Sequence, residues 1–128
     1  MTYITDTHSL VWYFTNDQRL GKKALKAFES TVQSGRIIVP TVVLAEIMFI
    51  ANKGRLLIGF TETVAKIESM ANFEIAVLDL DVLRLSEKTS VSLEMHDKII
   101  VATAMCYDGV LITKDEQITK SKVVKTVW

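Results

Sequence analysis

Residues 37–48, IIVPTVVLAEIM, decide the fold class of this chain. The β-branched run Ile37-Ile38-Val39 predicts a buried strand, and Pro40 suits the first turn of a helix because its fixed φ is already helical. The predicted helix, roughly 41–52, is apolar along its length and is interrupted by Glu46. A buried strand that leads at once into a buried helix is half of a βαβ unit, so this segment predicts an α/β fold.

The rest of the chain repeats this alternation of short apolar strands and helices. Further strands are predicted at 2–6, 74–80, 110–113 and 123–128. Helices are predicted at 7–14 with Thr7 as the N-cap, at 20–33, at 61–71 capped by Thr61, at 82–89 capped by Asp81, at 97–107, and from Asp115 onward. The pattern favours a parallel sheet with helices on both faces, with no linker or repeat to divide residues 1–128, so one domain is expected.

The composition says more about the cellular compartment of the protein than about its function. Fifteen basic residues balance fifteen acidic ones, and this neutrality neither favours nor excludes a nucleic-acid partner. The single cysteine, Cys106, cannot form an internal disulfide and is expected to be a small core residue. No apolar run approaches the ~18 residues of a membrane span, and the first strand begins without a basic leader. We therefore expect a cytoplasmic protein without a membrane partner.

Four acidic residues adjoin predicted core elements, where a carboxylate is costly unless it is paired or bound to metal. Asp6 and Asp115 follow predicted strands, and Asp97 and Asp115 begin predicted helices. Glu46 lies one to two turns into its helix, near the same edge of the sheet. Ligands of open parallel sheets bind outside the carboxyl ends of the strands, so the four acids are expected to share one pocket that holds a cation.

Oxygen donors without histidine or cysteine partners favour Mg²⁺ or Mn²⁺ over Zn²⁺, and such an ion suits phosphodiester hydrolysis. The Thr113 hydroxyl is placed to hold a water near the ion, and Lys98 and Lys114 to meet phosphate. Each acid also has a purely structural interpretation. Asp6 and Asp97 are good N-caps, Asp115 suits a turn, and Glu46 fits a partly exposed helix stripe. His8 and His96 are expected to be supporting residues rather than metal ligands, and Trp12 is expected to be a core residue.

Four segments together resemble the PIN domain family, and within it the VapC-type toxin ribonucleases of type II toxin–antitoxin systems. They are residues 4–12 (ITDTHSLVW), 39–47 (VPTVVLAEI), 96–104 (HDKIIVATA) and 111–115 (LITKD). The resemblance implies a three-layer α/β/α fold and a Mg²⁺- or Mn²⁺-dependent endoribonuclease. It also implies a homodimer, an RNA substrate and a cognate antitoxin that plugs the site. The acidic site would comprise Asp6, Glu46, Asp97 and Asp115, with Thr113 as an accessory residue.

Two departures from the family pattern bear on the grip on RNA. Lys98 stands where many relatives have arginine, which removes a bidentate fork, and Glu94-Met95-His96 replaces an Asp-Pro turn. Two other functions stay open. A catalytically silent PIN-like module could bind RNA or protein, and a phosphoacceptor receiver domain is also acidic and α/β. A receiver domain would need adjacent acidic residues after the first strand. That interpretation is weaker because Asp6 has no acidic neighbour there.

Overall fold

A computed structural model describes residues 1–89 and 92–128. The strands are β1 (Thr2–Thr5), β2 (Arg36–Pro40), β3 (Phe73–Ala76), β4 (Val110–Ile112) and β5 (Thr126–Val127). They form a sheet in the order β3-β2-β1-β4-β5, and every strand pair of the described residues is parallel. The α/β fold with a mainly parallel sheet, predicted from the alternation, is confirmed.

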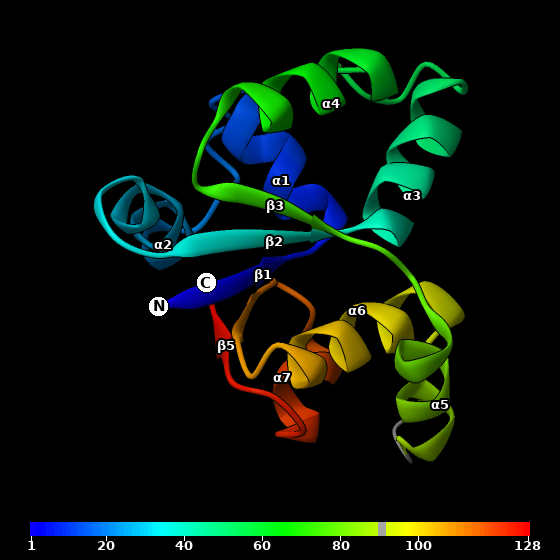
Figure 1. The fold of residues 1–128 in the computed structure, drawn as a ribbon. Coiled ribbons are helices and arrows are strands. Elements are labelled where there is room, and N and C mark those ends of the chain that lie inside the picture. The colour runs from blue at the N-terminus through cyan, green and yellow to red at the C-terminus, as the bar shows by residue number, and fades with distance from the viewer. Residues whose placement is uncertain (90–91) are drawn as a thin grey trace.

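The helices cover both faces of this sheet. They are α1 (Thr7–Phe14), α2 (Lys22–Gln33), α3 (Thr41–Ala51), α4 (Phe60–Ser69), α5 (Leu80–Lys88), α6 (Met95–Cys106) and α7 (Glu116–Ser121). In Figure 1, α1, α3 and α4 lie on one face and α5, α6 and α7 on the other. Parallel strands need such crossovers, and the chain reverses its direction across the sheet after β3, which places later helices on the second face. The structure has the expected three layers.

The core follows the centre of the sheet. Ile4 of β1 pairs with Ile38 of β2 and Leu111 of β4, and all three side chains are fully buried. Helix α6 contacts β1, β4 and α5, so the run of residues 99–104 is buried without the alternation of a surface helix. No helix in the described part of the chain has the length and apolar character to cross a membrane.

Three predicted N-caps, Thr7, Thr61 and Asp81, are wrong by one or two residues, and hydrogen bonding explains two of the differences. Asp6, not Thr7, is the N-cap of α1, and Asp79, not Asp81, is the N-cap of α5. An aspartate just before a helix can accept the free backbone N–H of the residue three positions later, as Asp6 and Asp79 do. Thr7 and Asp81 already lie within the first turn and do not occupy this capping position. Helix α4 begins after Gly59 instead of after Thr61, with no side-chain cap.

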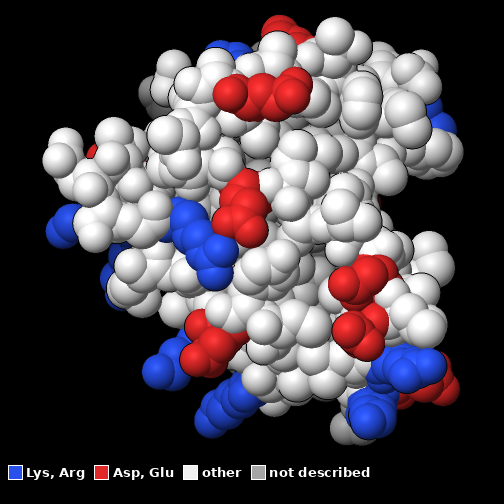
Figure 2. Space-filling model, viewed as in Figure 1, with Lys and Arg blue, Asp and Glu red and all other residues white. Residues whose placement is uncertain are grey.

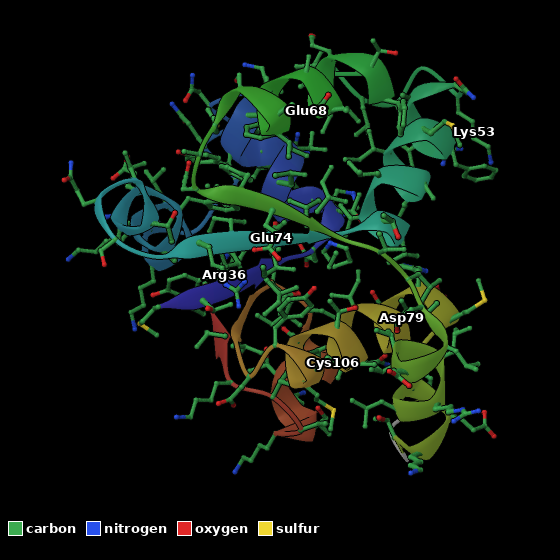
Figure 3. All side chains as sticks on the ribbon, in the orientation of Figure 1. Arg36, Lys53, Glu68, Glu74, Asp79 and Cys106 are labelled. Carbon is green, nitrogen blue, oxygen red and sulfur yellow. The ribbon has the colours of Figure 1, made fainter. Side chains whose placement is uncertain are left out.

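The strand predicted at 74–80 is shorter than expected, because β3 ends at Ala76. Val77 and Leu78 continue the apolar run, but they leave the sheet and are 71% and 37% exposed. Cys106 is also exposed, since it is the last residue of α6, so its expected burial is wrong. Figure 3 shows Cys106 and Asp79 on the side of the sheet that carries α5 and α6.

Charges of both signs are interspersed on the face shown in Figure 2. Arg36 of β2 and Glu74 of β3 form an ion pair of 2.8 Å across these strands, as Figure 3 allows the reader to follow. Figure 2 thus agrees with the balanced composition, and this face presents no field of a single sign.

Candidate active site

A cleft of about 520 Å³ lies at the carboxyl ends of β1 and β4. The strand order reverses here, because β2 and β3 lie on one side of β1 and β4 and β5 on the other. Such a switch point is where open α/β sheets bind ligands, since the two flanking helices leave the sheet in opposite directions. The cleft is lined by all four predicted acids, Asp6, Glu46, Asp97 and Asp115.

Asp6 directly follows β1 and caps α1. Its Oδ1 accepts the backbone N–H of Ser9 at 2.9 Å. Burial raises the pKa of Asp6 above its ordinary value of 3.8, while the hydroxyls of Ser9 and Thr113 and the Ser9 N–H oppose the rise. The structural interpretation of Asp6 as a cap is therefore correct, and it does not compete with a second role because a carboxylate offers about four lone-pair positions.

Asp97 lies in the first turn of α6 and is not its N-cap, a position that Glu94 occupies. Burial raises the pKa of Asp97, and the neighbouring His96 opposes this rise. Three other carboxylates raise it further through their negative charge, namely Asp115, Glu46 and Asp6. Three acids from other segments of the chain thus act electrostatically on Asp97.

His96 inserts between two of these acids. Its Nε2 lies 3.1 Å from Oε2 of Glu46 and 3.5 Å from Oδ1 of Asp97. Its Nδ1 is 3.9 Å from Oε2 of Glu94, whose side chain is largely exposed. The imidazole therefore stands where a cation between Glu46 and Asp97 would stand, a role that its position in the sequence did not indicate.

Thr113 joins the two aspartates that follow β1 and β4. The residue is 1% exposed, and its Oγ1 accepts the backbone N–H of Asp115 at 3.1 Å. Asp115 in turn caps α7, with Oδ1 accepting the Ile118 N–H at 2.9 Å. Because the same hydroxyl also lowers the pKa of Asp6, Thr113 fixes the relative placement of both acids from beneath the cleft.

The donor set fits a hard divalent cation in its chemistry, since it consists of carboxylate oxygens in a cleft open to water. Within residues 1–89 and 92–128, no group of three or more His, Cys, Asp or Glu side chains is already placed to hold a metal ion. In this arrangement Asp6 and Asp115 each use one carboxylate oxygen to cap a helix, and Glu46 faces His96. Mg²⁺ is often bound through only one or two carboxylates and several waters.

The other residues that line the cleft agree only in part with the sequence-based expectations. Lys114 lines it as expected, but Lys98 is not among the lining residues. Trp12, expected in the core, is partly buried against the core and also lines the cleft together with Trp128. No pattern in the sequence indicated that Trp12 and Trp128 would meet. The Thr7 hydroxyl is buried without a hydrogen-bond partner among the described residues.

Comparisons with known proteins identify the family and the fold of this chain. The sequence model of the family described as PIN domain matches residues 3–123. No curated protein matches the chain. Among solved structures, VapBC2 from Rickettsia felis bound to a promoter DNA fragment has 15% identity, a TM-score of 0.71, and coverage of 99% of this chain and 98% of that one.

Two further solved structures are similar along nearly their whole length. A toxin–antitoxin complex from Klebsiella pneumoniae has 20% identity, a TM-score of 0.68, and coverage of 98% of this chain and 96% of that chain. FitAcB from Neisseria gonorrhoeae has 16% identity, a TM-score of 0.66 and the same two coverages. At these identities the likeness establishes the fold.

Proposed function

Because the chain belongs to the PIN domain family, we propose that it is a metal-dependent endoribonuclease and the toxin of a toxin–antitoxin pair. Members of the family are typically nucleases and generally depend on a metal. The observation that carries the proposal is the meeting of Asp6, Glu46, Asp97 and Asp115 in one cleft at the switch point of the sheet. Helix capping explains the positions of Asp6 and Asp115, but it explains neither Glu46 nor Asp97.

Each residue has a distinct part in the proposed reaction. Asp6, Asp97 and Asp115 would hold Mg²⁺ or Mn²⁺, directly or through water, and Glu46 would position the ion or the attacking water. The bound ion would neutralise phosphate charge and make water a better nucleophile. Lys114 at the rim would contact the phosphate, and Thr113 would keep Asp6 and Asp115 in register from below.

The reaction is the hydrolysis of an RNA phosphodiester. The water oxygen forms a bond to phosphorus, and the bond from phosphorus to O3′ breaks. The attacking water gives up one proton to a neighbouring base, and the departing O3′ takes up one proton from solvent water, so the products carry a 5′-phosphate and a 3′-hydroxyl.

The protein partners in this proposal are a second copy of the chain and a cognate antitoxin. The similar structures include toxin–antitoxin complexes. Two groups of exposed apolar side chains support such partners, one from α3 through the following connection to α4 and one from the end of β3 to α6. They are Met48, Phe49, Leu57 and Phe60 in the first group, and Val77, Leu80, Leu83 and Met95 in the second.

A catalytically silent binding module is the second candidate, and the position of His96 favours it. An imidazole that is already paired with Glu46 and Asp97 blocks the cation's place unless it turns aside. The two candidates differ in one measurable property, since only the enzyme needs the acids to bind a divalent cation and to turn over RNA.

The test compares purified wild type with Asp97→Asn and Asp108→Asn on end-labelled single-stranded RNA, in Mn²⁺ and in EDTA. Asp108 is a matched control because it is exposed and follows the other end of α6. We expect Mn²⁺-dependent cleavage by the wild type and by Asp108→Asn, and none by Asp97→Asn. Equal cleavage by all three would show that the cleft is not the active site. Folded wild type that neither binds Mn²⁺ in calorimetry nor cleaves RNA would favour the binding module.

A further inference from the structure

Both tryptophans of the chain line the cleft that holds the four acids. The indoles of Trp12 and Trp128 meet edge to face, with ring centroids 5.9 Å apart and planes inclined by 64°. The His8 ring, also in the cleft, lies 5.5 Å from Trp12. Both indoles are only partly buried, so they form an aromatic corner within reach of solvent.

The fold holds this corner in place from two sides. Trp12 is on α1, the helix that Asp6 caps, so the indole and the carboxylate share one rigid element. Trp128 follows β5 and rests on Gly21, the N-cap of α2. A Cβ at Gly21 would lie only 2.7 Å from the Trp128 Cδ1 and its carbonyl carbon. Gly21 therefore leaves the space in which the Trp128 indole packs.

Basic groups accompany the corner. The Lys114 ammonium, next in sequence to Asp115, lies 5.9 Å from the Trp12 ring centroid and lines the cleft. The Arg19 guanidinium lies 4.8 Å from the same ring and is paired with Asp17. Lys114 has no ion-pair partner within 4.0 Å among the described residues, so its charge is available for a phosphate between the acids and the indoles.

We propose that Trp12 and Trp128 form the subsite for one unpaired nucleobase of the RNA, next to the phosphodiester held at the acids. The inference rests on the proposed function, because it takes the substrate to be RNA. The base stacks on one indole while its edge meets the other, and Lys114 contacts the adjoining phosphate. A base–aromatic stack needs a flat ring that solvent can reach beside a backbone contact, and the cleft offers two partly exposed indoles and the Lys114 ammonium.

This subsite selects the form of the RNA. In a duplex the bases are already stacked on one another and their faces are closed, so a stacking corner accepts only single-stranded or looped segments. Stacking depends weakly on base identity, because every base has a π-face. The corner thus discriminates unpaired from paired RNA, rather than one sequence from another.

The experiment uses the chain's own fluorescence, since its two tryptophans both lie in the corner. A short single-stranded oligoribonucleotide is titrated into the wild type in Ca²⁺, and gel electrophoresis verifies that the RNA stays intact. The same sequence as a duplex is the second probe. We expect quenching with the single strand and markedly weaker binding of the duplex. Trp12→Ala should weaken single-strand binding by about 5- to 100-fold, the loss that one base–aromatic stack represents.

Three variants separate stacking from folding. Trp12→Phe keeps a flat ring and should retain most of the affinity, whereas Gly21→Ala should weaken binding by displacing Trp128. Tyr107→Ala is the matched control, because the Tyr107 ring also carries a cation, Arg36 at 5.4 Å, but follows the far end of α6. Circular dichroism verifies that each variant is folded.

The outcomes distinguish this inference from the proposed function. RNA cleavage by the wild type, with unchanged binding by Trp12→Ala and Gly21→Ala, overturns the subsite and leaves the ribonuclease standing. Binding of single-stranded RNA in Ca²⁺ that Trp12→Ala abolishes, together with no cleavage by the wild type in Mn²⁺, supports the subsite and overturns the ribonuclease. Absence of quenching, or equal affinity for duplex and single strand, also overturns the subsite.

Discussion

Replacing Asp6 by alanine and by asparagine separates its two roles. Alanine removes both the carboxylate and the helix cap, whereas asparagine removes the charge but still accepts the Ser9 N–H, now at 2.9 Å from Oδ1. Both variants should lose RNA cleavage by more than about 100-fold, since neither supplies a metal-binding carboxylate. They should differ in stability by the cap alone, about 1 kcal/mol, which is about 4 °C in Tm for a chain of this size.

The chain contains a control of the same geometry at another place. Asp79 caps α5 through an Oδ1 that accepts the Val82 N–H at 2.9 Å, and it does not line the cleft. Asp79→Ala should therefore be about 1 kcal/mol less stable than Asp79→Asn, with cleavage unchanged in both. The measurements are urea unfolding followed by circular dichroism, and initial rates on labelled RNA. Cleavage at the wild-type rate by Asp6→Asn would reduce Asp6 to a cap and refute the reasoning.

The pH dependence of the Asp6→Asn stability gives an independent check on the metal-free protein. Burial raises the folded-state pKa of Asp6 above 3.8, so folding disfavours its ionised form. This cost is absent when both states are protonated, grows as the pH rises above 3.8, and is complete above the folded-state pKa. Asp6→Asn should thus be more stable than the wild type at pH 7 and lose that advantage in acid.

Three further variants test the cleft and the fold. His96→Ala should bind Mn²⁺ more tightly than the wild type in calorimetry, because Nε2 no longer occupies the place between Glu46 and Asp97; weaker binding would make His96 a ligand instead. Thr113→Val should lower the unfolding free energy by about 0.5–1.5 kcal/mol, since the partly buried Asp115 N–H loses its acceptor, and a change below about 0.3 kcal/mol would contradict that bond's role. Gly109→Ala should cost about 1–3 kcal/mol in the same assay, because its Cβ would overlap Ile4 Cδ1 and lie 3.0 Å from the Thr2 carbonyl oxygen; wild-type stability would show that β1 can shift freely.

The order of the strands and helices was predictable because burial leaves a simple trace in the sequence. Segments such as Ile37-Ile38-Val39 must be apolar on both faces of the sheet, and no surface strand has that pattern. The exact starts of helices were harder to predict, because Asp79 and Asp81 are equally good caps by residue type. Only the direction in which the chain leaves the sheet decides that Asp79 is the cap of α5.

The cleft was predictable for the same topological reason. Asp6 and Asp115 follow strands that a parallel sheet places side by side, so their proximity requires no knowledge of side-chain contacts. His96 and Trp128 were not predictable in this way. The position of His96 depends on the rotamer that brings Nε2 to Glu46, and that of Trp128 on contact with a glycine more than one hundred residues earlier.

Capping and metal binding are compatible roles for the same aspartates, and the cap assists the site. Each cap bond, Asp6 to Ser9 and Asp115 to Ile118, fixes one carboxylate oxygen at a helix start. The positive end of the helix dipole there stabilises a negative charge that burial would otherwise disfavour. A carboxylate ordered in advance loses little side-chain entropy when it binds a cation. His96 serves the other side of the cleft, since its contacts with Glu46 and Asp97 offset like-charge repulsion before a cation arrives.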